Sequence, residues 1–204
     1  SGTSPVFINH FQDYANNVIK KFPELQKKFV IDIGSNDGTL LRFFKEAGFS
    51  VLGVDPAKDI ARRANELGIE TVTGFISSEL AKKIRKEKGR AQIITANNVF
   101  AHSDDLKGIV ESVSILLDDS GIFIIEVSYL LDVLVKNLFD TIYHEHLAYH
   151  SIKPLSNFFL QNDFELIDIL RVNSHGGSVR VIAQKKNGSY PISQSVSDIL
   201  KLEK

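Results

Sequence analysis

The chain has 204 residues, a formal net charge of −1 and no cysteine. This length allows one domain with a full core, and the near balance of charges gives no electrostatic reason to expect nucleic acid or an anionic membrane as a partner. The lack of cysteine excludes disulfides, thiolate zinc sites and cysteine nucleophiles. No stretch approaches the ~20 apolar residues that span a bilayer, so we expect a cytoplasmic enzyme.

Residues 5–22 predict an amphipathic helix, because Phe7, Phe11, Tyr14 and Val18 recur at helical spacing. A helix with one apolar stripe needs a surface to cover. We expect this helix to form a lid over a ligand site.

Residues 29–55, which read FVIDIGSNDGTLLRFFKEAGFSVLGVD, have the pattern of a nucleotide-binding βαβ unit. The apolar run at 29–33 predicts a strand, the apolar residues after Gly38 recur at helical spacing, and a second strand ends at Asp55. Gly34 and Gly38 allow a ligand to approach the backbone, and the N-terminus of the following helix offers unpaired N–H groups.

The turn of this unit favours S-adenosylmethionine over a dinucleotide. A pyrophosphate binds the G-x-G-x-x-G spacing, whereas this turn reads Asp-x-Gly-x-x-x-Gly. Asp32 would repel a pyrophosphate and attract the ammonium group of a methionine, and Asp55 is placed to accept hydrogen bonds from both ribose hydroxyls. Alternatively, Asp55 only caps a helix that begins near Pro56. The predicted cofactor residues are Asp32, Gly34, Ser35, Asn36, Gly38, Asp55, Pro56, Phe75 and Asn97.

Strand and helix signals alternate after this unit, with short connections marked by glycine, which predicts a doubly wound parallel sheet. The predicted elements are a helix with Ile60, Ala64 and Leu67 that ends at Gly68, a strand at 69–73, a helix from Ser77 or Ser78 to Gly89, a strand at 91–96, a helix at about 104–117 and a strand at 122–127.

The last two strands change the pattern. Residues 164–172 and 178–185 predict strands joined by only a few residues, and so short a connection requires an antiparallel hairpin. An antiparallel strand that ends an otherwise parallel sheet predicts the α/β, Rossmann-like fold of class I S-adenosylmethionine-dependent methyltransferases, and it argues against a NAD-dependent enzyme. We divide the chain into an N-terminal helix or lid (1–26), a methyltransferase domain (27–186) and the start of a truncated C-terminal region (187–204).

Polar side chains follow the carboxyl ends of the strands, the edge at which open α/β sheets bind ligands. The candidates lie in 97–102 (NNVFAH), 140–149 (DTIYHEHLAY) and 175–180 (HGGSVR). Two imidazoles near a carboxylate permit a metal site, but no third ligand has suitable spacing. We prefer acid–base chemistry, in which a carboxylate orients an imidazole that removes a proton near neutral pH. A solvated loop is the plain alternative, and His10 and His150 are interpreted as structural.

Five motifs in this order, VIDIGSNDGTLL, VLGVDPA, ANNVFAH, FDTIYHEHLAY and HGGSVR, closely resemble the deoxysugar C-methyltransferases. The resemblance covers nearly the whole chain, and YHEH together with ANNVFAH is its specific part. Enzymes of this family use S-adenosylmethionine, which becomes S-adenosylhomocysteine, to methylate carbon 3 of a nucleotide-linked 4-keto-6-deoxy sugar. The resemblance therefore implies a nucleotide sugar as the substrate.

The resemblance also implies catalytic roles. His146 matches the histidine proposed to remove the proton beside the ketone, and Tyr143, Glu145 and His102 match residues around the sugar and the developing enolate. An enolate forms only where nearby hydrogen-bond donors stabilise it. In an extended loop Glu145 and His146 diverge, so a shared role requires the loop to turn. No metal is required, because the sulfonium methyl group is already activated.

The same comparison gives candidates for binding the substrate. Asn98 matches a sugar-contacting asparagine, whereas Asn97 would lie nearer the methionine end of the cofactor. His175 and Arg180 are further candidates, although a tight hairpin with an ordinary sheet arginine explains them equally well.

Members of this family have a cysteine-rich zinc module before this domain and a second α/β domain after it. We expect this chain to be one piece of such a protein, which retains cofactor binding but needs the flanking domains for turnover. Two other functions stay open. One is an oxygen or nitrogen methyltransferase acting on a small molecule, and the other is a cofactor-binding module without activity that supports a partner domain.

Overall fold

The computed structural model describes residues 5–25, 28–139, 142–174 and 176–204. Its elements in chain order are α1 (Pro5–Lys21), the short 3-10 helix η1 (Pro23–Leu25), β1 (Phe29–Ile33), α2 (Thr39–Glu46), β2 (Ser50–Asp55), α3 (Lys58–Glu66), β3 (Thr71–Thr73), α4 (Ser78–Lys88), β4 (Ala91–Asn97), α5 (Leu106–Leu116), β5 (Leu117–Ser128), α6 (Leu130–Val135), α7 (Ile152–Gln161), β6 (Phe164–Val172), β7 (Ser178–Lys185) and α8 (Gln194–Leu202).

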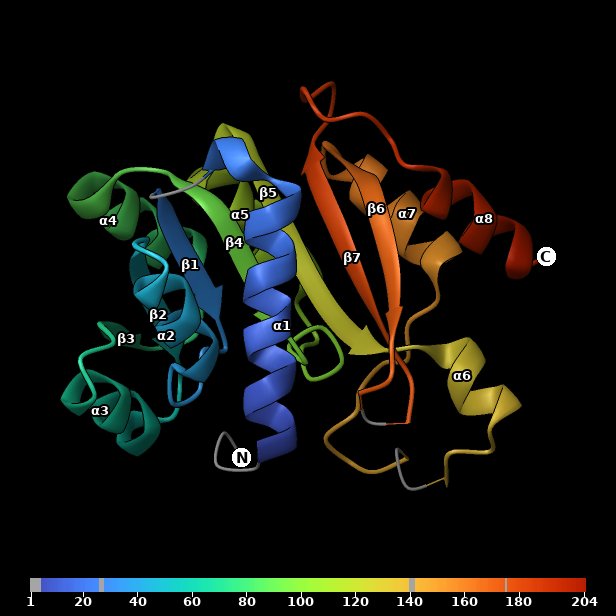
Figure 1. Ribbon diagram of the computed structural model, residues 1–204, viewed down its shortest axis with the longest axis horizontal. Coiled ribbons are helices and arrows are strands. Elements are labelled where there is room, and N and C mark those ends of the chain that lie inside the picture. The colour runs from blue at the N-terminus through green and yellow to red at the C-terminus, as the bar shows by residue number, and fades with distance from the viewer. Residues whose placement is uncertain (1–4, 26–27, 140–141, 175) are drawn as a thin grey trace.

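A seven-stranded sheet forms the centre of the molecule, with the order β3-β2-β1-β4-β5-β7-β6 (Figure 1). The neighbours from β3 to β5 pair in parallel, whereas β7 pairs antiparallel with both β5 and β6. The chain reverses its strand order between β1 and β4, and open α/β sheets bind ligands at such a switch point. The predicted α/β fold with a terminal antiparallel strand is confirmed.

Helices cover both faces of the sheet, and each face has its own apolar core. On one face, α1 and α2 contribute Tyr14, Val18 and Phe44, which pack against strand residues such as Ile93 and Ile124. The buried core of the other face takes side chains from α4, α5, α7 and α8. The central strands read as continuous apolar runs because both of their faces are buried.

Several element boundaries differ from the sequence prediction. Helix α3 ends at Glu66, and Leu67, which was expected on its apolar face, is 71% exposed. Strand β3 begins at Thr71 instead of residue 69. Helix α5 begins later than expected because the Asp105 side chain accepts a hydrogen bond from Gly108 N–H and so caps the helix.

Helix α7 was not predicted, and its sequence contains Pro154. Proline lacks the backbone N–H and its ring clashes with the preceding helical turn, but in the first turn that N–H has no intrahelical partner and there is no preceding turn to clash with. A proline in this turn is therefore compatible with the helix.

The N-terminal and C-terminal segments both pack on the sheet. Tyr14 and Val18 of α1 are buried, as is Val196 of α8, and Ser193 N–H donates to the Ile167 carbonyl of the edge strand β6. The proposed domain boundaries and the action of α1 as a lid stay predictions. Within the described residues, no helix has both the length and the apolar character that crossing a bilayer requires.

Candidate cofactor and active site

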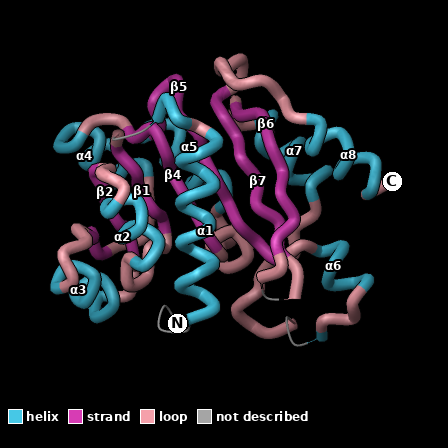
Figure 2. The backbone as a smooth tube through the Cα atoms, viewed as in Figure 1, coloured by secondary structure: helices cyan, strands magenta, loops and turns pink. Residues whose placement is uncertain are grey.

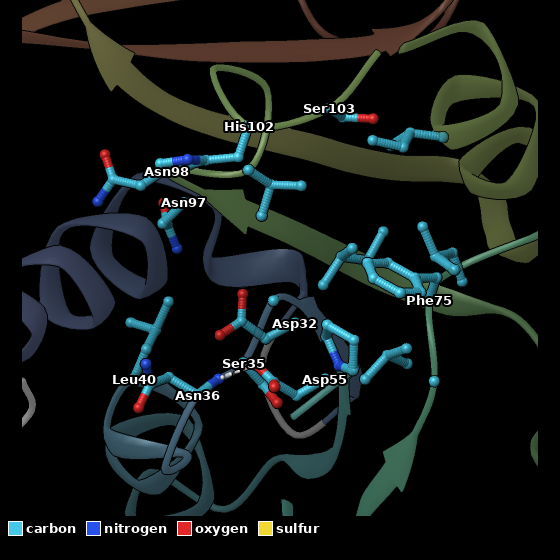
Figure 3. Close-up of a pocket in the computed structure, with 18 of the residues that line it drawn as sticks. Asp32, Ser35, Asn36, Leu40, Asp55, Phe75, Asn97, Asn98, His102 and Ser103 are labelled. Carbon is cyan, nitrogen blue, oxygen red and sulfur yellow. Dashed lines mark hydrogen bonds between the residues drawn. The ribbon is translucent and has the colours of Figure 1, made fainter. Parts of the chain in front are cut away.

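A cavity of about 750 Å³ opens at the carboxyl ends of β1, β2 and β4. Figure 3 shows Asp32, Ser35, Asn36 and Asp55 on one wall and Asn97, Asn98 and His102 on the opposite wall, with Phe75 at one end. The lining also includes Phe7, Phe11, Ile33, Gly34, Asp37, Thr39, Leu40, Val54, Pro56, Gly74, Ile76, Val99, Ser103, Asp104, Asp105 and Ile109. The cavity thus lies at the switch point of the sheet.

The turn after β1 is held by backbone hydrogen bonds. The N–H groups of Gly34 and Ser35 donate to the Val54 carbonyl (2.8 and 3.3 Å), and Gly38 N–H donates to Ser35 (3.0 Å). A Cβ atom on Gly34 would lie 2.6 Å from Val99 Cγ2, at a φ of +70°. Glycine is required here because the turn passes close to the loop after β4 with a left-handed backbone.

Asp55 at the end of β2 is 7% exposed and lines the cavity. Its Oδ2 accepts from Asn36 N–H (2.9 Å, Figure 3) and its Oδ1 accepts from Ala57 N–H (2.9 Å). The N-cap of α3 is Ala57, so the alternative in which Asp55 caps that helix is wrong. The two N–H donors fix the carboxylate at the cavity wall, where its remaining lone pairs can accept further hydrogen bonds.

Asp32 at the end of β1 is buried, and its Oδ1 accepts a hydrogen bond of 2.6 Å from Thr95 Oγ1. Burial raises the pKa of Asp32 to about 7, with the Thr95 hydrogen bond opposing this effect and the negative charge of Asp55 adding to it. A cationic ligand next to Asp32 would favour the ionised form and restore a normal carboxylate.

Two polar side chains at the cavity wall have buried polar atoms. Neither the hydroxyl of Ser35 nor the amide of Asn97 forms a hydrogen bond of good geometry with the described residues, although the Asn97 amide lies close enough to the Tyr14 hydroxyl to oppose the rise in pKa that burial causes in that tyrosine. Native proteins satisfy most of their buried polar groups, so such a group at a cavity wall indicates a ligand contact. Both residues were predicted from the sequence to bind the cofactor, and the amide and hydroxyl fit its polar groups.

The charges that line the cavity all have one sign. Five aspartates belong to the lining, namely Asp32, Asp37, Asp55, Asp104 and Asp105, and within the described part of the chain no lysine or arginine does. Carboxylates that face a cavity attract a cationic ligand and repel a phosphate. The residues present therefore fit an adenosine that carries a cationic amino acid, and they do not fit a pyrophosphate.

Of the nine predicted cofactor residues, eight line the cavity: Asp32, Gly34, Ser35, Asn36, Asp55, Pro56, Phe75 and Asn97. The ninth, Gly38, is the N-cap of α2, with a φ of +76°. A Cβ atom at Gly38 would lie 2.8 Å from Ile69 Cγ2, so this glycine shapes the turn.

Three of the four predicted catalytic residues, His102, Tyr143 and His146, come together from two loops. Leu147 N–H donates to the Ala101 carbonyl (2.7 Å), and His102 Nδ1 donates to the Glu145 carbonyl (2.8 Å). These bonds join the segment 142–150 to the loop after β4, of which His102 lines the cavity. The centroids of the His102 and His146 rings are 5.0 Å apart.

The loop turns at the predicted cluster, as a shared role of its residues requires. His146 N–H donates to the Tyr143 carbonyl (3.1 Å), and the Tyr143 hydroxyl lies 3.1 Å from His146 Nε2. Glu145 points elsewhere, since its carboxylate is largely exposed and lies 4.0 Å from the His144 ring. Within the part of the chain that the structure describes, the Tyr143 side chain is in hydrogen-bond contact with the His146 ring, whereas that of Glu145 is not.

His150, interpreted as structural, is buried where this segment meets α7. Its Nε2 donates to the Phe100 carbonyl (3.1 Å), and burial lowers its pKa. A neutral, hydrogen-bonded His150 therefore adds a further link between the two loops. Among the described residues, no group of His, Cys, Asp or Glu side chains is arranged to hold a metal ion.

The predicted substrate-binding residues have different positions. Asn98 lines the cavity, with a φ of +56°. Arg180 is 4% exposed and is not a lining residue, because its Nε and Nη2 both donate to Glu126 Oε2 (2.9 and 2.8 Å). This contact favours the alternative of an arginine inside the sheet. His175 lies outside the described residues.

Sequence reasoning missed several lining residues. Ser103, Asp104 and Asp105 follow β4, so their position at the carboxyl edge of the sheet was a usable signal. The same reasoning applies to Asp37 and Thr39, which follow β1. Glu126 lies within an apolar strand and has four hydrogen-bond contacts, with α1, β7 and the connection between β6 and β7. No sequence signal indicated these contacts.

Comparison with known proteins identifies the family. The family model described as "Methyltransferase domain" matches residues 8–169. The chain belongs to this family. Its members are enzymes that use S-adenosylmethionine as the methyl donor, so the cofactor predicted from the turn is confirmed at the level of the family.

Two curated relatives share sequence with this methyltransferase domain. C-methyltransferase NovU of Streptomyces niveus is 32% identical over 197 residues, which are 97% of this chain and 47% of that protein. Ubiquinone biosynthesis O-methyltransferase of Hydrogenovibrio crunogenus is 28% identical over 107 residues, which are 50% of this chain and 44% of that protein. The chain therefore spans no more than about half the length of these relatives.

Solved structures share the fold at low identity. The magnesium protoporphyrin IX methyltransferase ChlM of Synechocystis PCC 6803, with bound SAH, superposes with a TM-score of 0.66 at 14% identity, over 86% of this chain and 83% of that one. The PH0226 protein of Pyrococcus horikoshii OT3 gives a TM-score of 0.69 at 16% identity, over 91% and 94%. These likenesses concern the architecture of the sheet and its helices.

Proposed function

We propose that this methyltransferase domain acts on carbon, and that its substrate is a nucleotide-linked 4-keto-deoxysugar. The observation that carries the proposal is the contact between the Tyr143–His146 turn and the loop that ends at His102, beside the cofactor cavity. The relative NovU, a C-methyltransferase that is similar over 97% of this chain, supports the same chemistry.

The proposed cofactor contacts follow from the cavity. Asp55 accepts hydrogen bonds from the ribose hydroxyls, Asp32 receives the ammonium group, and the amide of Asn97 binds at the methionine end. When bound, S-adenosylmethionine supplies a methyl group on a positively charged sulfur. The excess of carboxylates in the lining matches this charge.

The proposed base is His146. A carbon beside a ketone carries an acidic C–H bond, and the imidazole takes that proton while the bonding electrons move into an enolate. The Tyr143 hydroxyl, 3.1 Å from His146 Nε2, orients the ring. With Nδ1–H bound to the Glu145 carbonyl, His102 on the facing loop can donate Nε2–H to the enolate oxygen only as the doubly protonated imidazolium. In that form it lowers the barrier, because negative charge develops on the enolate oxygen.

The substrate class rests on the motifs described above and on the similarity to NovU. Because this chain spans about half of that relative, we infer that flanking regions of a longer protein complete the substrate site. Cytoplasmic location and the absence of a nucleic-acid or membrane partner stay predictions from composition.

A second candidate is methylation of oxygen, with nitrogen as a related acceptor. Half of the chain is 28% identical to an O-methyltransferase, and a histidine beside the cavity can also deprotonate a hydroxyl group. In this case the methyl group would form an ether or ester, which chemical cleavage removes, whereas a methyl group on carbon resists such cleavage.

Calorimetry with S-adenosylhomocysteine and NADH tests the cofactor half of the proposal. We expect S-adenosylhomocysteine to bind and NADH, which carries a pyrophosphate, to give no measurable heat, because the cavity lining holds five aspartates and, in the described residues, no cation. Binding of NADH with the higher affinity would contradict the proposal.

Product analysis tests the catalytic half in the full-length protein. With a labelled methyl donor and a keto-sugar nucleotide, we expect a product whose label survives ether and ester cleavage. His146→Ala should lower the rate by about 10²–10⁴-fold, the usual contribution of a general base, while binding of S-adenosylhomocysteine is retained. An unchanged rate in this variant, or a label lost on ether cleavage, would refute the proposed mechanism.

A further inference from the structure

Glu126 is a buried carboxylate at the carboxyl end of β5, and it is 4% exposed. Arg180 of β7 donates two hydrogen bonds to its Oε2 (2.9 and 2.8 Å). Its Oε1 is 2.7 Å from His10 Nε2 of α1 and accepts from the Ser174 hydroxyl at 3.1 Å. Each carboxylate oxygen thus has two contacts, so Glu126 is fully satisfied although it lies in the sheet.

These contacts join the segments that surround the cavity. The backbone carbonyl of Glu126 accepts from Asn98 N–H (2.8 Å), which holds the start of the loop that carries His102. Ser174 belongs to the β6–β7 connection. Helix α1 runs across the face of the sheet (Figure 2), with its N-terminal end on the side of the β1 and β5 arrowheads (Figure 1).

The contact with His10 lies at the half of α1 that borders the cavity. Phe7 and Phe11 line the cavity, yet none of residues 5–13 is buried, and the first buried side chain of the helix is Tyr14. Apolar packing therefore fixes the second half of α1 more firmly than the first. Phe11 packs against the apolar core while only partly buried. The hydrogen bond from His10, whose side chain is 20% exposed, adds an attachment in this half of the helix, where packing is weaker than in the second half.

The charges at Glu126 make this attachment strong. Burial on its own would raise the pKa of Glu126, but the hydrogen bond from His10 and the positive charge of Arg180 lower it below the usual value, so the carboxylate is ionised. The Arg180 guanidinium lies 3.6 Å from the centroid of the Tyr14 ring, which adds a cation–π contact between β7 and α1. Hydrogen bonds to an ionised group are stronger than those between neutral groups.

We infer that His10 and Glu126 are positioning residues, and that their hydrogen bond holds Phe7 and Phe11 of α1 against the cofactor cavity. The inference rests on the proposed cofactor site and deepens it. His10 and Glu126 do not line the cavity, yet they affect the affinity for the methyl donor. Loss of the bond frees the first half of α1 and leaves the cofactor with an incomplete wall.

The test compares variants at the two ends of α1 in this chain. His10→Ala removes the bond, and His10→Gln retains an amide donor near the position of Nε2. Lys21→Ala is the matched control, because it removes the ion pair between Lys21 and Asp168 at the other end of the same helix. Hydrogen exchange over residues 5–13 in the ligand-free protein and calorimetry with S-adenosylhomocysteine give the two measurements.

We expect His10→Ala to increase exchange over residues 5–13 and to weaken S-adenosylhomocysteine binding roughly 3- to 10-fold, the effect of one lost hydrogen bond. In His10→Gln, the exchange over residues 5–13 and the affinity for S-adenosylhomocysteine should both return most of the way to the wild-type values. In Lys21→Ala, both should equal the wild-type values. Equal exchange in wild type and His10→Ala would overturn the inference, and so would a Gln variant no better than the Ala variant. Because exchange needs no ligand, it tests the attachment even if the proposed cofactor fails to bind.

Glu126→Gln extends the test as a double-mutant cycle. Its carboxamide has one acceptor oxygen instead of two, so when Arg180 pairs with that oxygen the amide nitrogen faces His10 and no longer accepts an N–H from the imidazole. If the two residues act through one bond, adding His10→Ala to Glu126→Gln should give no further increase in exchange over residues 5–13. Additive effects would contradict a shared bond, and the His10 series remains decisive where the Glu126 variant does not fold.

Discussion

Asp32 is a carboxylate whose protonation depends on its burial at the end of β1. With its pKa raised to about 7, the ligand-free protein binds a proton there at pH 6 and has lost most of it by pH 8. A ligand ammonium pairs with the ionised form, so we expect the affinity for S-adenosylhomocysteine to increase from pH 6 to pH 8.

Calorimetry across this range checks the expectation, and Asp32→Asn is its control. The amide keeps the shape of the side chain but cannot ionise. The variant should therefore bind S-adenosylhomocysteine more weakly, and its affinity should lack the part of the pH dependence that comes from Asp32. A wild-type profile parallel to that of Asp32→Asn would show that Asp32 does not titrate in the binding reaction.

Asp55 gives a prediction at the same scale. Its carboxylate is fixed by the N–H groups of Asn36 and Ala57, and we expect it to bind the ribose hydroxyls. Hydrogen bonds to charged groups contribute about 1.5–3 kcal/mol, so Asp55→Ala should weaken S-adenosylhomocysteine binding roughly 10- to 100-fold. Asp59→Ala is the control, since the Asp59 side chain is 92% exposed on α3. Unchanged affinity in Asp55→Ala would refute the ribose contact.

Individual residues differ in how well the sequence predicted them. Asp32, Asp55 and Asn97 lie at the carboxyl ends of strands that the apolar pattern identifies, and the ends of parallel strands meet at one edge. Tyr143 and His146 form a local turn. Their separation of three residues in the sequence is compatible with such a turn but does not require it. The bond between His10 and Glu126 spans 116 positions, and the choice of such a partner depends on how α1 crosses the sheet, which no local pattern encodes.

Among the elements, the turn between β1 and α2 depends on glycine at two positions, Gly34 and Gly38. At Gly38 an alanine would have a φ of +76° and would place its Cβ 2.8 Å from Ile69 Cγ2, whereas at Gly68 the φ is +80° and the nearest atom is Lys45 Nζ at 3.7 Å. The left-handed backbone costs about 1–2 kcal/mol in either variant, and overpacking adds about 1–3 kcal/mol in Gly38→Ala alone.

Urea denaturation of the two alanine variants measures this difference. We expect the free energy of unfolding to be lower in Gly38→Ala than in Gly68→Ala. Equal values would mean that Ile69 moves aside without cost, and that the turn tolerates a side chain.

The elements themselves were largely predictable, because most strands of the sheet are buried on both faces and read as apolar runs. The short connection before Ser178 sufficed to predict the antiparallel hairpin. The ends of helices were less predictable, since they depend on caps such as Asp105. Helix α7 was not among the predicted elements, and its sequence contains a proline, Pro154, in the first turn.

At the scale of the whole molecule, Glu203 connects the C-terminal helix to the rest of the fold. Its carboxylate accepts from the N–H groups of Ile152 and Lys153 (2.6 and 2.8 Å) at the start of α7, and from the Tyr129 hydroxyl (2.9 Å). It thus caps a helix that lies about fifty residues earlier in the chain. This contact favours a fold in which residues 187–204 stabilise the methyltransferase domain.

Glu203→Ala tests this connection. Loss of a helix cap costs about 0.5–2 kcal/mol, so we expect a decrease of about this size in the free energy of unfolding. Glu87→Ala, at an exposed position of α4, is the control and should leave stability unchanged. A value for Glu203→Ala equal to that of the control would indicate that the C-terminal segment is energetically separate from the domain.

The negative lining of the cavity has a consequence for competition inside a cell. Many abundant adenosine compounds, such as ATP, ADP and coenzyme A, carry phosphate groups, and a pocket with a lysine at its wall would hold them much of the time. The five aspartates around this cavity repel the phosphate groups of these compounds and do not repel the adenosine itself. We therefore expect the cavity to discriminate against phosphorylated adenosine compounds in favour of a methyl donor that carries a positive charge.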